Sequence, residues 1–169
     1  MIKISINNLV VILYENRANC KKFEKAIDDI DLNICNSQGA NILHYFASYA
    51  VEYNLSKSCF LEVLLSKGLN INTPETKGNG YTALHIAVLK KDIELCELLL
   101  DNGANIDAES ASGNSPLFVA VMDYRGNDGG IITFLIEKGA NINHCNKLGY
   151  SPLIMSETIA NYDLGQFFK

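Results

Sequence analysis

The sequence predicts an all-α protein in which pairs of helices recur along the chain. Two observations predict this fold class. A glycine-centred segment recurs at a nearly constant interval, and a series of helix N-cap residues recurs out of phase with it. Self-similarity at a period of about 20–50 residues is typical of repeat proteins, in which each unit buries its apolar face against its neighbours.

The first series is predicted to mark the ends of helices. It comprises Gly68-Leu-Asn-Ile-Asn72, Gly103-Ala-Asn-Ile-Asp107 and Gly139-Ala-Asn-Ile-Asn143, whose glycines are 35 and 36 residues apart. Apolar runs typical of helices precede them, at residues 60–65, 93–100 and 131–136. We expect the three glycines to end these helices in the left-handed conformation, which glycine adopts at little cost.

The second series marks helix starts. It reads Gly39-Ala-Asn-Ile-Leu-His44, Gly80-Tyr-Thr-Ala-Leu-His85, Gly113-Asn-Ser-Pro-Leu-Phe118 and Gly149-Tyr-Ser-Pro-Leu-Ile154. The third residue of each segment is Asn, Thr or Ser, whose side chains cap helix N-termini well. Pro116 and Pro152 follow two of these caps, at a position where the missing N–H of proline would be unpaired in any case.

These two patterns together resemble the ankyrin repeat. The closest resemblance is carried by the Gly-x-Thr-Ala-Leu-His-x-Ala run at residues 80–87 and the Leu-Leu-Leu-x-x-Gly-Ala-Asn-Ile-Asp run at 98–107, and the likeness extends over roughly residues 30–160. The resemblance implies an ankyrin-repeat solenoid of antiparallel helix pairs with β-hairpin loops that project at right angles. It also implies that His44 and His85 form local hydrogen bonds near the hairpins.

We expect one ankyrin-repeat domain over residues 1–169. Residues 1–36 form an N-terminal capping repeat with helices at 3–14 and 19–28, residues 37–148 form about three full repeats, and residues 149–169 form a C-terminal capping repeat. Asp29 stands where the glycine of the first series is expected, and aspartate tolerates a left-handed conformation better than most residues. Extra residues in the first full repeat predict a first helix that continues through Tyr53, and those at 123–130 predict a polar turn.

Composition excludes several classes of partner and site. The chain has 14 basic and 19 acidic residues with no Lys/Arg stripe, so no nucleic acid is expected as a partner. No apolar run reaches the ~20 residues of a membrane span, and no signal-peptide cleavage pattern follows the apolar start. Five scattered cysteines without a Cys-x-x-Cys pair predict reduced thiols and a cytoplasmic location.

No segment combines the residues that catalysis or cofactor binding requires. Gly78-x-Gly80-x-x-Ala83 imitates a dinucleotide fingerprint but lacks the preceding buried strand, and Asp123, Asn127 and Asp128 lack the spacing of a calcium loop. His144 and Cys145 are adjacent, whereas catalytic pairs meet in space and need a third orienting group. We therefore expect no catalytic, cofactor-binding or metal-binding residues, and we keep an enzyme with an unrecognised site as the remaining alternative.

The surface that remains is the concave side which the resemblance implies, formed by hairpin tips and the exposed ends of the first helices. Its predicted partner-binding residues are Tyr49, Lys77, Asn79, Tyr81, Leu89, Glu109, Ser112, Asn114, Met122, Asp123, Lys147 and Tyr150. Tyrosine is enriched at interface hot spots because it buries a large ring and keeps a polar group.

The chain is accordingly predicted to be a protein–protein interaction module that is a monomer when unbound. Two roles stay open for it. One is a toxin-neutralising immunity protein or antitoxin, suggested by a short acidic array with no attached domain. The alternative is a host-directed or regulatory ankyrin adaptor or effector.

Overall fold

The structure is a computed structural model that describes residues 2–126, 129–159 and 162–168. Within these ranges the chain forms nine α-helices and a 3-10 helix, and no strand beyond an isolated bridge between Ile2 and Ile30. The helices are α1 (Ile6–Glu15), α2 (Cys20–Ala26), α3 (Ile42–Tyr49), α4 (Lys57–Ser66), α5 (Ala83–Leu89), α6 (Ile93–Asp101), α7 (Pro116–Asp123), α8 (Gly130–Glu137), α9 (Pro152–Thr158) and the 3-10 helix η1 (Leu164–Phe168).

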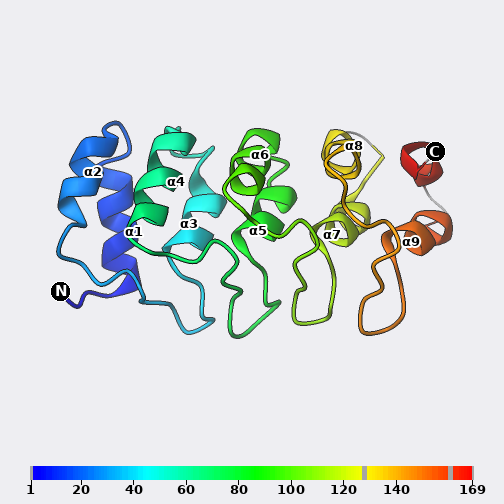
Figure 1. The fold of residues 1–169 in the computed structure, drawn as a ribbon, viewed down its shortest axis with the longest axis horizontal. Coiled ribbons are helices and arrows are strands. Elements are labelled where there is room, and N and C mark those ends of the chain that lie inside the picture. The colour runs from blue at the N-terminus through cyan, green and yellow to red at the C-terminus, as the bar shows by residue number, and fades with distance from the viewer. Residues whose placement is uncertain (1, 127–128, 160–161, 169) are drawn as a thin grey trace.

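The helices form two rows, which confirms the all-α solenoid. The inner row consists of α1, α3, α5, α7 and α9, each packed on the next, and the outer row consists of α2, α4, α6 and α8 (Figure 1). Four loops, which lead into α3, α5, α7 and α9, project from the same side of the two rows (Figure 1). We call the side on which the loops and the exposed ends of the inner helices lie the inner face. It corresponds to the predicted concave side.

The predicted N-caps are confirmed at the start of four inner helices. The Ser115 and Ser151 hydroxyls accept hydrogen bonds from the backbone N–H groups of Phe118 and Ile154, each at 3.2 Å. At the start of α3 the Asn41 side chain accepts from Leu43 N–H at 3.0 Å. An N-cap of this kind is worth about 1 kcal/mol because it satisfies an N–H that has no partner within the helix.

The glycines of the first series also behave as predicted. Gly68, Gly103 and Gly139 have φ of 84°, 88° and 90°. Among the described residues, Asn54 and Lys91 are the non-glycine residues that have a positive φ.

The prediction of a first helix continuing through Tyr53 is wrong. Helix α3 ends at Tyr49, and residues 50–54 form a turn in which Tyr53 N–H bonds to the Tyr49 carbonyl at 2.9 Å. The turn closes at the left-handed Asn54, where Leu55 N–H bonds back to the Ala50 carbonyl at 3.0 Å. The same closure follows α5, where Asp92 N–H bonds to the Ala87 carbonyl at 3.0 Å after the left-handed Lys91. The extra residues therefore form a turn that closes the helix.

Asp29 does not adopt the left-handed conformation expected of it. Helix α2 ends at Ala26, and the segment after it pairs with the N-terminal residues instead of forming a projecting loop. Ile2 N–H donates to the Asp29 carbonyl, and Asp31 N–H donates to the Ile2 carbonyl at 3.3 Å. These bonds hold the backbone at Asp29 in a bridge that needs no positive φ.

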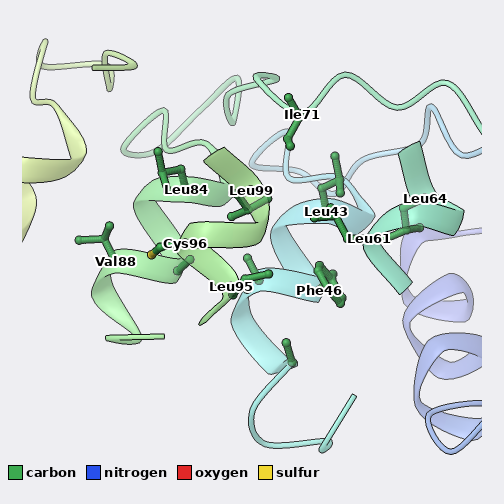
Figure 2. Packing of buried hydrophobic residues seen from close by; sticks show 14 of the residues in the cluster. Leu43, Phe46, Leu61, Leu64, Ile71, Leu84, Val88, Leu95, Cys96 and Leu99 are labelled. Atoms are coloured by element: carbon green, nitrogen blue, oxygen red, sulfur yellow. The ribbon is translucent and has the colours of Figure 1, made fainter. Parts of the chain in front are cut away.

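The core is a continuous apolar layer between the two rows. Figure 2 shows Leu43 and Phe46 of α3 beside Leu61 and Leu64 of α4, and Leu84 and Val88 of α5 beside Leu95, Cys96 and Leu99 of α6. Each labelled side chain except Ile71 is at most 1% exposed. Full burial of a leucine or phenylalanine stabilises the fold by about 1.5–3 kcal/mol, so this shared layer makes each helix pair depend on its neighbours.

The expectation of five reduced thiols is wrong for two of the cysteines. Cys20 begins α2 and Cys59 lies in α4, the next helix of the outer row, and the two form a disulfide with a Cα–Cα distance of 6.3 Å. The pairing arises because stacking of the repeats brings together residues 39 apart in sequence. Cys35, Cys96 and Cys145 are free.

Candidate functional site

The projecting loops are hydrogen-bonded to one another, which fixes the inner face. Lys77 N–H donates to the Gln38 carbonyl at 2.8 Å, Ala111 N–H to the Asn79 carbonyl at 2.8 Å, and Lys147 N–H to the Ser112 carbonyl at 3.0 Å. Each bond joins the tip of one loop to the tip of the next. The tips therefore form one connected backbone edge from which side chains can be presented at a set spacing.

Two histidines tie inner helices to the following loops, and the local bonds expected for them are confirmed. His44 Nε2 lies 3.0 Å from the Tyr81 carbonyl and His85 Nε2 lies 3.0 Å from the Asn114 carbonyl, so each Nε2–H donates to a loop. The Nδ1 atoms accept from the backbone N–H of Asn41 at 3.1 Å and of Thr82 at 3.3 Å. Both histidines are therefore neutral, with the proton on Nε2.

Burial keeps these histidines neutral. It lowers the pKa of His85 to about 4, against the weaker opposing effect of the hydrogen bond to the Asn114 carbonyl. Burial likewise lowers the pKa of His44, and the hydrogen bond to the Tyr81 carbonyl opposes it. The stacked ring of Tyr81 covers His85, with centroids 5.1 Å apart and planes 7° apart. Tyr81 thus helps to fix the structure of the inner face and is also part of its surface.

The histidine tie is missing in the third full repeat, where Phe118 occupies the equivalent position. Phe118 has no ring donor, and two cavities of the inner face border it. One, of about 270 Å³, lies between α5 and α7, and the other, of about 420 Å³, lies between α7, α9 and the loop that leads to α9. Asn114, Phe118 and Met122 border both, so the two cavities form one interrupted groove.

The structure brings most of the predicted partner-binding residues to this groove. Those that line it are Tyr81, Leu89, Ser112, Asn114, Met122, Asp123 and Tyr150. Tyr49 lines a third, more polar cavity of about 190 Å³ with His44, Tyr45 and Ser48. Lys77, Asn79, Glu109 and Lys147 are exposed in the projecting loops, where Lys147 Nζ donates to the Ala111 carbonyl at 2.8 Å.

Residue-by-residue prediction missed Phe118 and Met155 as parts of the surface. Both line the larger cavity, although Phe118 is only 5% exposed. The change from His44 and His85 to Phe118 at one repeat position was the signal in the sequence. The sequence alone indicates only a helix start there, because the size of the opening that Phe118 leaves depends on the fold.

The outer face has a different chemistry. Ion pairs join successive outer helices: Lys57 Nζ lies 2.7 Å from both Asp92 Oδ1 and Glu94 Oε2, and Lys138 Nζ lies 2.8 Å from Glu97 Oε1. Glu62 and Glu137 are exposed on α4 and α8. These charges lie on the outer row of helices, away from the inner helices that border the groove.

His144 and Cys145 are adjacent in sequence, and their side chains contact different groups. His144 Nε2 lies 3.5 Å from Glu109 Oε1 of the preceding loop, and Cys145 Sγ lies 3.5 Å from the Asn143 carbonyl. Burial raises the pKa of the Cys96 thiol to about 12, which leaves it protonated. The considered calcium loop includes Asn127 and Asp128, which lie outside the described residues.

In residues 2–126, 129–159 and 162–168, no group of three or more His, Cys, Asp and Glu side chains is arranged to hold a metal ion. Every helix within the same ranges is too short or too polar to span a bilayer.

Comparison with known proteins agrees with the repeat fold described above. A family model of three ankyrin-repeat copies matches residues 4–110 and 48–146. Ankyrin repeat protein OPG189 of Variola virus is 33% identical over 129 residues, which cover 75% of this chain and 21% of that protein. The putative ankyrin repeat protein FPV031 of Fowlpox virus is 41% identical over 92 residues, or 53% of this chain and 26% of the relative.

A similar match lies in a vertebrate protein. The nuclear factor NF-kappa-B p105 subunit of Gallus gallus is 37% identical over 100 residues, which cover 59% of this chain and 9% of the relative. The chain thus spans about a quarter or less of the length of these relatives.

Proposed function

The chain belongs to the ankyrin-repeat family, a family of protein-interaction modules, and we propose that its inner face binds a partner protein. The observation that carries this proposal is the interrupted groove at Phe118 and Met122, framed by loops whose tips are hydrogen-bonded to each other. A fixed frame lowers the entropy lost on binding, and a partly apolar concavity provides area to bury.

The exposed side chains of the inner face support this choice of surface. Leu89, Met122, Leu148, Tyr150 and Ile154 belong to the loops and inner helices and are 37%, 43%, 78%, 46% and 41% exposed. Large apolar side chains that gather on one face of a water-exposed protein mark an interaction site. The outer helices carry the exposed carboxylates Glu62, Glu94 and Glu137, and Ile93 at the start of α6 is 39% exposed beside Glu94.

Two biological roles fit such a surface. A toxin-neutralising immunity protein or antitoxin would use it to cover the active site of a toxin, whereas an adaptor or effector would use it to hold a regulatory or host protein. A cytoplasmic location loses its original support, since stable disulfides are rare in the reducing cytosol and Cys20 is paired with Cys59.

Binding measurements on variants of the two faces test the proposal. With a partner identified by affinity capture and purified, Tyr150→Ala should weaken binding by about 2 kcal/mol, roughly thirtyfold, if Tyr150 is a hot spot. Glu62→Ala and Glu137→Ala on the outer helices should change the affinity by less than about threefold. Calorimetry would measure both, after circular dichroism shows that each variant is folded.

The opposite pattern would overturn the proposal. If Tyr150→Ala, Leu89→Ala and Met122→Ala leave the affinity unchanged while the outer-face variants reduce it, the partner binds the outer face. Tyr81→Ala is a poorer test, because the ring of Tyr81 stacks on His85 and its loss would also disturb the frame.

A further inference from the structure

The two cavities on either side of Phe118 and Met122 differ in chemistry, and this difference indicates what they bind. The cavity on the α9 side, about 420 Å³, is lined mainly by apolar side chains, including Met122, Leu148, Tyr150 and Met155. Leu148 is 78% exposed at its rim. Such a cavity has room for one large aliphatic or aromatic side chain, whose burial would also cover apolar surface that now faces water.

The cavity on the α5 side contains a carboxylate. Asp123 lies at the end of α7 and is half-buried beside Leu89, Phe118 and Met122. No Lys, Arg or His among the described residues forms an ion pair with it. Lys90 occupies the equivalent position one repeat earlier, at the end of α5, and is exposed, and no acidic side chain in the described part of the chain forms an ion pair with it.

A carboxylate at an apolar wall favours a cationic group that can bring its own hydrogen-bond donors. A lysine or arginine side chain fits, because its methylene groups pack on the wall while the charged end meets Asp123. The net charge of −5 also favours the approach of a basic segment. A basic side chain is therefore favoured over an acidic one as the occupant of the cavity beside Asp123.

We propose that the groove recognises a partner segment that carries a large apolar side chain and, about 10 Å away, a lysine or arginine. The apolar side chain enters the cavity at Leu148 and Tyr150, and the cation pairs with Asp123. The spacing follows from the distance between packed helices, about 8–10 Å, and equals three residues of polyproline II conformation, which rise about 9 Å and return the side chain to the same side of the segment. This inference rests on the proposed function and adds the chemistry of the partner.

Short peptides test the inference without knowledge of the natural partner. The probe is an acetylated tetrapeptide amide with leucine first, arginine fourth and alanine between them. Two matched peptides replace the arginine with glutamate or the leucine with alanine. Titration followed by ¹⁵N–¹H spectra should show saturable binding of the first peptide, with a dissociation constant on the order of 1 mM. Shifts should centre on α7 and the loop that leads to α9, and each matched peptide should bind about tenfold more weakly.

Two variants of equal charge change locate the cation. Asp123→Asn and Glu62→Gln each remove one negative charge, one in the groove and one on the outer face. Asp123→Asn should weaken binding of the leucine–arginine peptide about tenfold, and Glu62→Gln should change it by less than twofold. Met122→Ala should weaken it as well, because Met122 borders both cavities.

The outcomes separate this inference from the proposed function. If the leucine–glutamate peptide binds as tightly as the leucine–arginine peptide, or if Glu62→Gln weakens binding as much as Asp123→Asn, the pairing with Asp123 is wrong. If no peptide shifts the groove residues while Tyr150→Ala still weakens binding of the whole partner, the partner chemistry inferred here is wrong and the inner face remains the binding surface.

Discussion

Removal of the Cys20–Cys59 disulfide should destabilise the protein by a calculable amount. The bond joins residues 39 apart, and the chain-entropy model assigns a loop of this length about 4 kcal/mol at 25 °C. The double variant Cys20→Ser/Cys59→Ser is the suitable perturbation, since a single substitution would leave a reactive unpaired thiol. With an unfolding entropy of about 2.1 cal/mol/K per residue over 169 residues, the melting temperature should fall by about 11 °C if the array unfolds as one unit.

Three measurements check this expectation. Thermal unfolding should give the same fall in melting temperature for the double variant as for the wild type in a phosphine reductant. The double variant Cys35→Ser/Cys145→Ser, which removes two exposed free thiols, should melt as the wild type does. Thiol titration of denatured, unreduced protein should count three thiols, those of Cys35, Cys96 and Cys145.

Two results would refute the reasoning. Titration of five thiols would show that Cys20 and Cys59 are reduced in solution, as composition alone had indicated. A titration of three thiols with no change in melting temperature would show that the bond forms but closes a loop that stays ordered in the unfolded chain.

Three further predictions concern stability. Burial lowers the pKa of His85 from 6.5 in the unfolded chain to about 4, so the unfolded state binds more protons between these values. Stability should be fully present above pH 6.5 and fall as the pH drops towards 4, by about 2 kcal/mol at pH 5, and urea unfolding should show a smaller fall in His85→Gln. Gly80→Ala should lower the free energy of unfolding by more than the ~1–2 kcal/mol of left-handed strain, because the added Cβ would lie 2.7 Å from Ala111 N. Gly103→Ala should show the strain alone in the same assay, because its Cβ would have no atom within 4 Å. Deletion of residues from Ser151 onward should expose the apolar side of α7 and cause aggregation measurable by light scattering, and a soluble truncated protein with an unchanged melting curve would contradict the assignment of 149–169 as a capping repeat.

Most of the fold follows from local rules that the sequence displays. Asn41, Thr82, Ser115 and Ser151 start helices because their side chains satisfy N–H groups, and Gly68, Gly103 and Gly139 end them because φ is near 90°. Each rule needs only a few neighbouring residues. Repetition at a fixed period then makes the stack of helix pairs predictable.

The predictions that are wrong concern places where contacts between distant segments determine the structure. Cys20 and Cys59 meet only because α2 and α4 are neighbours in the stack. The backbone at Asp29 depends on pairing with Ile2. The turn after α3 closes at the left-handed Asn54, where the sequence has no glycine that would predict a positive φ. The twelve predicted surface residues stay a prediction as binding residues, although seven of them line the groove.

The location of the groove follows from one change of side chain at a repeated position. His44 and His85 each donate from Nε2 to a carbonyl of the next loop and so join helix to loop. At the third occurrence Phe118 offers no donor, so among the described residues the Tyr150 carbonyl accepts from Asn146 N–H alone, at 2.9 Å within its own loop. The Tyr81 and Asn114 carbonyls accept the equivalent loop bonds, from Glu75 N–H at 2.9 Å and Ser110 N–H at 3.0 Å, in addition to the histidine bonds. Asn146 Nδ2 also donates to Asn114 Oδ1 at 2.8 Å, so that loop is held by the preceding loop and not by α7. The opening between α7 and its next loop is therefore lined by the carbon atoms of Phe118 and Met122, and an exposed apolar opening gains stability when a partner fills it.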